Sequence, residues 1–154
     1  MTPDEVLAER YADRFEQRIA DGMLARANEH VTGMPEYLAI RMIEVGPGWC
    51  VAALEVRPEL LNPFGAAHGA VLASLVDHVL GSAVFPIVPL GTWPATLEFK
   101  LNYVAPAREG TLTARAEVVS ISSRTAVVSV ECTNGDRVVG TALGTIAITP
   151  PKPG

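Results

Sequence analysis

The chain has 154 residues, of which 49% are hydrophobic, 19% charged and 6% aromatic. This length fits one domain, and the apolar content excludes intrinsic disorder, which requires few apolar residues and many charges. Twelve Lys and Arg against 17 Asp and Glu give a net charge of −5 without a basic cluster. A nucleic-acid partner is therefore not expected, because phosphate binding requires clustered Lys and Arg.

Residues 1–35 are expected to form an N-terminal helical extension. Thr2-Pro-Asp-Glu5 has the pattern of a capping box with proline at the first helical position. The apolar residues that follow at every fourth position are Leu7, Tyr11, Phe15 and Ile19. This spacing predicts one amphipathic helix that ends at Gly22, then a shorter helix to about His30 and a linker over residues 31–35. The early charges and the lack of an apolar run predict no signal peptide and a cytoplasmic location.

Residues 36–149 are expected to form the main domain, followed by a flexible tail over residues 150–154. The segments with strand-like sequence are 38–45, 49–56, 96–103, 111–121, 125–132 and 137–148. Turn residues separate them at 46–48 and at Asn134-Gly135, a strong hairpin signal. Residues 69–84 are apolar almost all round, which predicts a helix buried on all sides. One antiparallel sheet curled around this helix, an α+β fold, satisfies the order.

Two further features bear on the setting of the protein. The tract from residue 70 to residue 90 is the most apolar, but it is interrupted by Asp77, His78, Pro86 and Pro89. We therefore expect no transmembrane helix and no membrane partner. Cys50 and Cys132 lie in apolar, strand-like runs without metal-ligand spacing, so we interpret them as buried free thiols in a reducing compartment.

Asp77 is the only formally charged residue between Leu60 and Leu97. It lies in the middle of the helix expected to be most buried. An unpaired carboxylate there costs several kcal/mol, so Asp77 should either find hydrogen-bond donors or become easier to protonate. A carboxylate perturbed in this way is a candidate catalytic group, while pairing with a backbone amide or a distant Arg would make it structural.

His68 and Gly69 stand where the loop from Asn62 enters the same helix. Glycine permits close approach of a ligand, and the free first-turn amides at the positive end of the helix suit a developing oxyanion. A purely structural role for His68 stays open. His78 points about 100° away from Asp77 around the helix, so we interpret it as structural or interfacial. The same divergence argues against a metal site built from these residues.

Several of these residues resemble the signature of the hotdog-fold acyl-CoA thioesterases, in the PaaI-like (phenylacetate-pathway) branch. The matching features are Asn62-Pro-Phe-Gly-Ala-Ala-His-Gly69, Asp77 nine residues after His68, and the strand T-L-E-F-K-L-N-Y-V-A-P over residues 96–106. The resemblance runs from about residue 38 to residue 148. It implies a hotdog fold and hydrolysis of an acyl-CoA or aryl-CoA thioester to the free acid and coenzyme A. It implies no metal or redox cofactor, since coenzyme A is part of the substrate.

The resemblance also implies roles for individual residues. Asp77 matches the general base or nucleophile, and the amide of Gly69 matches the group that polarises the thioester carbonyl. Asn62 and His68 match supporting polar residues near the carbonyl and the attacking water, and Thr96 matches a hydroxyl that helps to hold that water. The acidic residue of the family faces the loop of a partner chain, which implies a homodimer or homotetramer with shared active sites.

Two other functions stay open at this point. A hotdog-fold dehydratase or hydratase pairs a catalytic His with an acid and could use His68 and Asp77, although the loop lacks the aromatic and proline surroundings of that class. A non-catalytic acyl-CoA sensor or binding module usually carries a DNA-binding appendage, for which residues 1–35 are too short and too acidic. Small residues around the motif admit a medium aliphatic or an aryl group alike.

Overall fold

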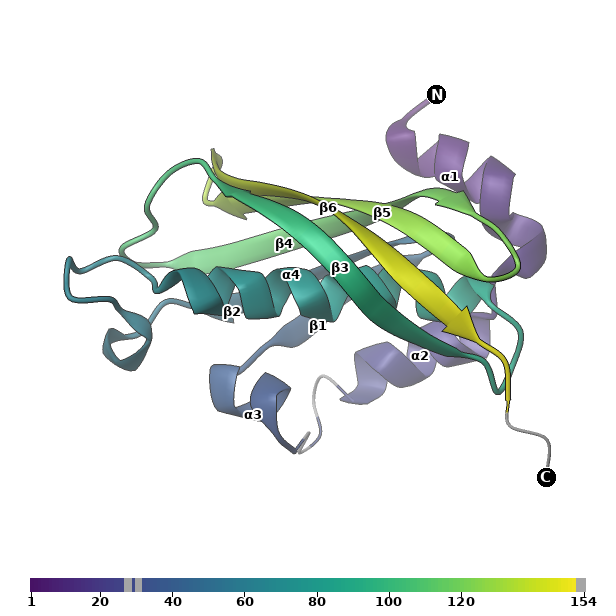
Figure 1. Ribbon diagram of the computed structural model, residues 1–154, viewed down its shortest axis with the longest axis horizontal. Coiled ribbons are helices and arrows are strands. Elements are labelled where there is room, and N and C mark those ends of the chain that lie inside the picture. Colours follow the sequence, from purple (N-terminus) through teal and green to yellow (C-terminus); the bar gives the residue numbers. More distant parts are fainter. Residues whose placement is uncertain (27–28, 30–31, 152–154) are drawn as a thin grey trace.

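The computed structural model describes residues 1–26, 29 and 32–151 (Figure 1). Its helices are α1 (Pro3–Tyr11), α2 (Gln17–Arg26), α3 (Met34–Leu38) and α4 (Gly69–Val84), with short 3-10 turns at Ala12–Arg14, Pro58–Leu60 and Phe85–Ile87. Its strands are β1 (Arg41–Gly46), β2 (Trp49–Glu55), β3 (Trp93–Tyr103), β4 (Thr111–Ile121), β5 (Thr125–Asn134) and β6 (Arg137–Thr149).

The strands form one six-stranded sheet in the order β1-β2-β4-β5-β6-β3, and every neighbouring pair is antiparallel. In this order β1 and β3 are the two edge strands. Helix α4 runs along one side of the sheet (Figure 1). The predicted hairpin at Asn134-Gly135 joins β5 to β6. This arrangement confirms the predicted α+β hotdog fold with an N-terminal helical extension.

Helix α4 supplies the centre of the hydrophobic core, and its predicted bounds, residues 69–84, are confirmed. The α4 side chains buried in the core are Val71, Leu72, Leu75, Val76, Val79, Leu80, Ala83 and Val84. Full burial of a Val or Leu side chain stabilises a fold by roughly 1.5–3 kcal/mol. The stretch Gly69–Ile87 is long and apolar enough to cross a membrane, but here it is the core helix of the domain.

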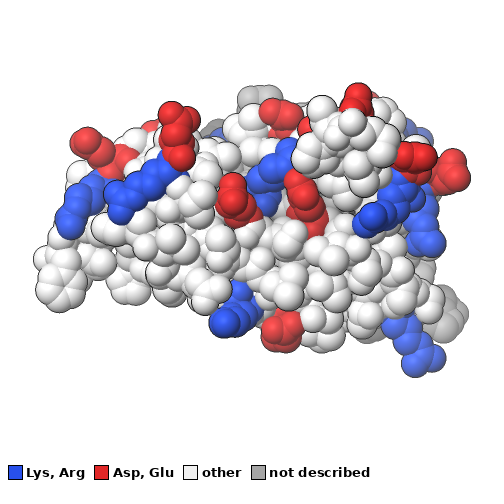
Figure 2. Space-filling view, turned by 90° about the horizontal axis from the view of Figure 1, so that it is seen from above, with Lys and Arg blue, Asp and Glu red and all other residues white. Residues whose placement is uncertain are grey.

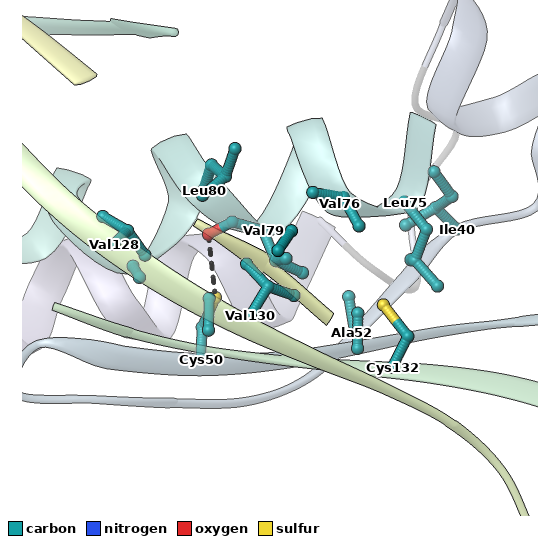
Figure 3. Packing of buried hydrophobic residues seen from close by; sticks show 14 of the residues in the cluster. Ile40, Cys50, Ala52, Leu75, Val76, Val79, Leu80, Val128, Val130 and Cys132 are labelled. Atoms are coloured by element: carbon teal, nitrogen blue, oxygen red, sulfur yellow. Dashed lines mark hydrogen bonds between the residues drawn. The ribbon is translucent and has the colours of Figure 1, made fainter. Parts of the chain in front are cut away.

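Both cysteines lie in this core and are free thiols, as predicted. Figure 3 shows Cys50 below α4, where its Sγ donates a hydrogen bond to the carbonyl of Val79 at 3.4 Å. Burial raises the pKa of both thiols, that of Cys132 to about 12. The thiolate is the reactive form of cysteine, so burial keeps both groups unreactive.

One side of α4 stays uncovered in the single chain. Ala70 and Asp77 are exposed, and Ser74 and Gly81 on the same side are half-buried. The prediction of a helix buried on all sides is therefore wrong. The physical reason is that one sheet covers only the side of the helix against which it packs, and the small residues of α4 lie on the side left open.

Strand β3 contains a bulge that changes which of its residues face α4. The register skips Leu97, so Thr96 pairs with the buried Ile146 while Glu98 pairs with the next residue of β6. Paired residues share a side of the sheet, so Thr96 faces the core side and Leu97 is 62% exposed. From the alternation of apolar and polar residues in segment 96–103 we predict that Leu97 faces the core and Thr96 the opposite side, and this prediction is wrong because a bulge reverses the alternation. Tyr103, at the end of the strand, is also exposed.

The N-terminal extension begins as predicted, but its later part differs from the prediction. The capping box is confirmed, since the Thr2 hydroxyl accepts from the Glu5 N–H at 3.2 Å and the Glu5 carboxylate accepts from the Thr2 N–H at 2.6 Å. The prediction of one helix ending at Gly22 is wrong. The chain turns after the 3-10 segment, where the Glu16 N–H donates to the Pro86 carbonyl at 2.8 Å, and Gly22 lies inside α2.

Two boundaries before the sheet also differ from the prediction. The expected linker over residues 31–35 contains the start of α3, which begins at Met34. The expected first strand began at residue 38, but Leu38 ends α3 and β1 begins at Arg41, because Ala39 takes a left-handed conformation (φ 55°) that separates the two. The expected helix end at His30 lies outside the described residues.

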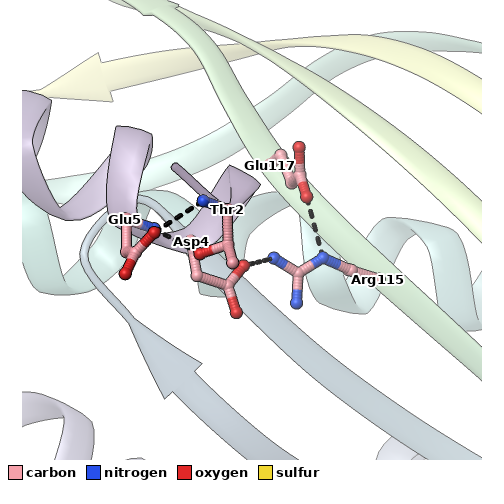
Figure 4. Close-up of polar contacts among 5 residues, drawn as sticks. All are labelled: Thr2, Asp4, Glu5, Arg115 and Glu117. Carbon is pink, nitrogen blue, oxygen red and sulfur yellow. Dashed lines mark hydrogen bonds and ion pairs between the residues drawn. The ribbon is translucent and has the colours of Figure 1, made fainter.

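Helix α1 is attached to strand β4 by polar contacts. Arg115 pairs with Asp4 of α1 and, at 2.8 Å, with Glu117 (Figure 4). The buried Tyr11 hydroxyl donates to the Val118 carbonyl at 3.3 Å. Figure 2 shows that Lys and Arg side chains alternate with Asp and Glu side chains over one face of the molecule, so the two signs largely balance there.

Candidate active site

The loop before α4 is folded around the side chain of Asn62. The Asn62 Oδ1 accepts from the Phe64 N–H at 2.9 Å and from the Ala66 N–H at 3.2 Å, and the Asn62 N–H donates to the Ala66 carbonyl at 2.7 Å. Gly65 supplies the positive φ (75°) that this tight turn requires. The amide oxygen of Asn62 therefore acts within the loop and fixes its shape.

The segment after β3 holds this loop in place. The guanidinium of Arg108 donates to the carbonyls of Phe64 at 3.0 Å and Gly65 at 3.2 Å. The Ala67 N–H donates to the Ala107 carbonyl at 2.7 Å. The loop is therefore tied to the β3–β4 connection before the chain enters α4.

The first turn of α4 has one capped amide and one uncapped amide. His68 is the N-cap residue, and its Nδ1 accepts from the Ala70 N–H at 3.0 Å. The Tyr103 hydroxyl donates to the Gly69 carbonyl at 2.9 Å. Within the described part of the chain, the Gly69 N–H has no hydrogen-bond acceptor. A Cβ atom at Gly69 would lie 3.1 Å from the Tyr103 ring, so glycine allows this close approach.

Asn62 and Gly69 line one pocket of about 360 Å³. Its other wall is the end of β3 and the segment after it, with Tyr103, Val104, Ala105, Pro106 and Ala107. His68 does not share this pocket and lines a separate hollow on the α3 side of the helix. The structure therefore brings Asn62 and Gly69 together and assigns His68 to the cap.

Asp77 and Thr96 lie together in a shallow hollow between α4 and β3. Asp77 belongs to the open side of α4 and is exposed. In the described residues, its carboxylate forms no hydrogen bond or ion pair within the chain. The expectation that Asp77 is buried is therefore wrong for the single chain, because the sheet does not cover this side of the helix. The bulge at Leu97 turns Thr96 toward this hollow.

Four of the predicted site residues form two pairs, Asn62 with Gly69 and Asp77 with Thr96, and His68 lines a separate hollow. Gly69 and Asp77 are eight residues apart on one helix, about 12 Å at a rise of 1.5 Å per residue. A single carbonyl group cannot contact both within one chain. Among the described residues, no group of three or more His, Cys, Asp and Glu side chains could hold a metal ion.

Two residues that hold the helix start were not found from the sequence. Tyr103 gave no signal beyond its place in the strand-like segment 96–103, whereas its hydroxyl contacts Gly69. Arg108 carried no signal, because a single Arg in a loop is an ordinary surface residue. Only the tertiary structure brings these side chains to the motif.

The chain is similar to known thioesterases. Residues 64–141 match the thioesterase superfamily. The 1,4-dihydroxy-2-naphthoyl-CoA hydrolase of Listeria monocytogenes is 29% identical over 102 residues, which cover 66% of this chain and 83% of that protein. The human acyl-coenzyme A thioesterase 13 is 28% identical over 111 residues, or 71% of this chain and 75% of that protein.

A solved structure adds a likeness in fold. The phenylacetic acid degradation protein PaaI of Thermus thermophilus, determined as a mutant, has 31% sequence identity and a TM-score of 0.68. The match covers 73% of this chain and 96% of that chain. The predicted resemblance is thereby confirmed. This chain belongs to the thioesterase superfamily and is a hotdog-fold, PaaI-like thioester hydrolase.

Proposed function

We propose that this protein hydrolyses an acyl-CoA or aryl-CoA thioester, with Gly69 and Asp77 of two different chains at each active site. The observation that carries the proposal is the open side of α4. It presents an exposed carboxylate without a partner in the described part of the chain, and the same helix begins with an uncapped amide. These are the two groups that thioester hydrolysis requires, a base and an oxyanion donor.

The Gly69 amide would bind the carbonyl oxygen. As water or a nucleophile adds to the carbonyl carbon, this oxygen becomes an oxyanion. A backbone N–H at the positive end of a 16-residue helix stabilises that charge. The contacts of Asn62, Tyr103 and Arg108 support this role, because they fix the amide before the substrate arrives and no reorganisation is needed during the reaction.

Asp77 would start the reaction from the other side of the carbonyl. As a general base it takes a proton from water while the C–O bond forms, the C–S bond then breaks, and the proton passes to the departing thiolate of coenzyme A. As a nucleophile it would instead form an anhydride that water hydrolyses. The hydroxyl of Thr96 lies in the same hollow and would orient the water or the carboxylate.

A second chain would complete the site by covering the open side of α4. Strand β3 is an edge strand with free backbone groups, and it carries the exposed Trp93 and Leu97. Such an edge pairs readily with another chain. Two chains joined there would bring the loop and Gly69 of one chain toward Asp77 of the other, without a metal or redox cofactor.

Subunit mixing tests the shared site. The Asp77→Ala and Gly69→Val proteins should each be inactive in an assay of coenzyme A release. After equal mixing and complete exchange, half of the dimers are hybrids with one intact site each, so about a quarter of the wild-type activity should return. Mass measurement verifies the exchange. Verified exchange without recovered activity would contradict the shared site. If the wild-type protein binds an acyl-CoA but releases no coenzyme A, the protein is a binding module.

A further inference from the structure

The tip of the loop before α4 carries an exposed aromatic side chain. Phe64 is 85% exposed, more than any other large hydrophobic side chain in the described residues. Its backbone is nevertheless fixed on both sides, because its N–H donates to the Asn62 Oδ1 at 2.9 Å and its carbonyl accepts from the guanidinium of Arg108 at 3.0 Å. A residue held in this way loses little conformational entropy when its side chain is buried by another molecule. Phe64 therefore has the features of a preformed anchor.

An apolar pocket of about 520 Å³ lies at the other end of α4. Its aromatic and thioether side chains come from α2, β1, β3 and the turn after α4, and they are Met23, Met42, Trp93 and Phe85. Of the described residues that line the pocket, only Arg26 carries a formal charge, and Arg26 is exposed. Aromatic rings and methionine thioethers pack favourably against a further aromatic ring. The pocket therefore matches the side chain of a phenylalanine in its chemistry.

The shared site proposed above determines how two chains face each other. If Gly69 of each chain lies opposite Asp77 of the other in one two-fold interface, the two α4 helices run antiparallel. The loop that precedes Gly69 extends past the start of α4 (Figure 1), so it lies level with the residues that follow Asp77 in the partner chain. Gly81 lines the pocket and lies four residues, or about 6 Å, beyond Asp77 on the same side of the helix. The loop of one chain therefore faces the pocket of the other.

We propose that Phe64 of each chain inserts into this pocket of a second copy of the chain and anchors the dimer. The proposal rests on the shared site of the proposed function. Trp93 connects the two contacts, because it lines the pocket and belongs to the edge strand β3, whose free backbone groups are available to the same second chain. Trp93 is 68% exposed, and the ring of the partner's Phe64 covers it. One contact, made twice in each dimer, thus removes an exposed aromatic ring and an open apolar pocket from water.

Cysteine cross-linking tests the contact directly. Phe64→Cys combined with Gly81→Cys places one thiol on the loop and one in the pocket, and a Cβ atom at Gly81 meets nothing within 4 Å. The native thiols are buried and unreactive. Mild oxidation should convert most of this protein into disulfide-linked dimers on a non-reducing gel. The matched control joins Phe64→Cys to Gly22→Cys, at a helical glycine that also has open space but does not line the pocket, and it should give only traces of linked dimer.

The strength of the dimer gives a second, independent measurement. Phe64→Ala removes the anchor from both contacts, so the dissociation constant of the dimer in analytical ultracentrifugation should rise by about 100-fold or more, as for loss of two buried aromatic anchors. Val119→Ala, at an exposed apolar residue of the inner strand β4, should leave this constant unchanged.

The outcomes separate this contact from the proposed function. An unchanged dissociation constant in Phe64→Ala, or equal cross-linking of the Gly81 and Gly22 pairs, would overturn the anchor. If the Gly81 pair forms no cross-link while subunit mixing still restores activity, the pocket has another occupant, so the contact of Phe64 fails and the shared active site stands.

Discussion

The first turn of α4 and the turn that carries Asp77 belong to one helix but are built in opposite ways. Around Gly69, the loop, the cap and the strand end are joined by hydrogen bonds from Asn62, His68 and Tyr103. Around Asp77, the described part of the same chain offers the carboxylate no hydrogen bond or ion pair. An oxyanion donor must be fixed in advance, whereas a base on an open face gains its surroundings from the substrate and a second chain.

The largest effect is expected at the turn of α4 that carries Asp77. Asp77→Asn keeps the shape of the side chain and removes its charge, so kcat should fall by about 10²–10⁴, the range for loss of a general base. Because Asp77 is exposed, urea unfolding should show little change in stability. Asp13→Asn, at another exposed carboxylate, is the control. Near wild-type turnover in Asp77→Asn would make Asp77 an ordinary surface residue.

The second-largest effect is expected at the first turn of α4, where Gly69 lies. Gly69→Val pushes side-chain atoms toward the Tyr103 ring and shields the uncapped amide, so kcat should fall by about 10²–10³, as for loss of one oxyanion donor. A change confined to KM would mean that the amide binds the ground state and the transition state equally. Gly22→Val, at a helical glycine distant from the first turn of α4, serves for comparison.

A variant of Thr96 tests whether a hydroxyl from the same chain assists Asp77 in the reaction. Thr96→Val keeps the branched shape and deletes one hydrogen bond of about 1–3 kcal/mol, which predicts a rate decrease of roughly 5- to 150-fold with KM little changed. Thr113→Val, a similar change on strand β4, should leave the rate unaltered. Equal rates for both variants and the wild type would leave Thr96 as part of the sheet alone.

The smallest effect is expected at the cap. His68→Ala removes the acceptor of the Ala70 N–H, so the free energy of unfolding should fall by about 0.5–2 kcal/mol in urea titration. His68→Ser restores a capping oxygen and should recover most of this loss. If the alanine variant is as stable as the wild type, the Nδ1 contact does not hold the helix start.

The same contrast explains what could be predicted from the sequence. The start of α4, the hairpin at Asn134-Gly135 and the capping box depend on neighbouring residues, and all three were predicted correctly. The bulge at Leu97 depends on how β3 meets β6, and the exposure of Asp77 depends on how far the sheet extends around the helix. Neither leaves a local pattern, so both were missed. The spacing of Gly69 and Asp77 on one helix, in contrast, does follow from the sequence and separates the two groups within one chain.

The bulge at Leu97 has a consequence for how the protein avoids aggregation. An edge strand of eleven residues would invite open-ended addition of further strands, the route to fibrils. Because the bulge interrupts the ladder, the edge is divided into two short segments, residues 93–96 and 98–103, whose phases differ by one residue. A foreign strand in phase with one segment is out of phase with the other, so this edge favours one short pairing with a second chain over open-ended addition of further strands.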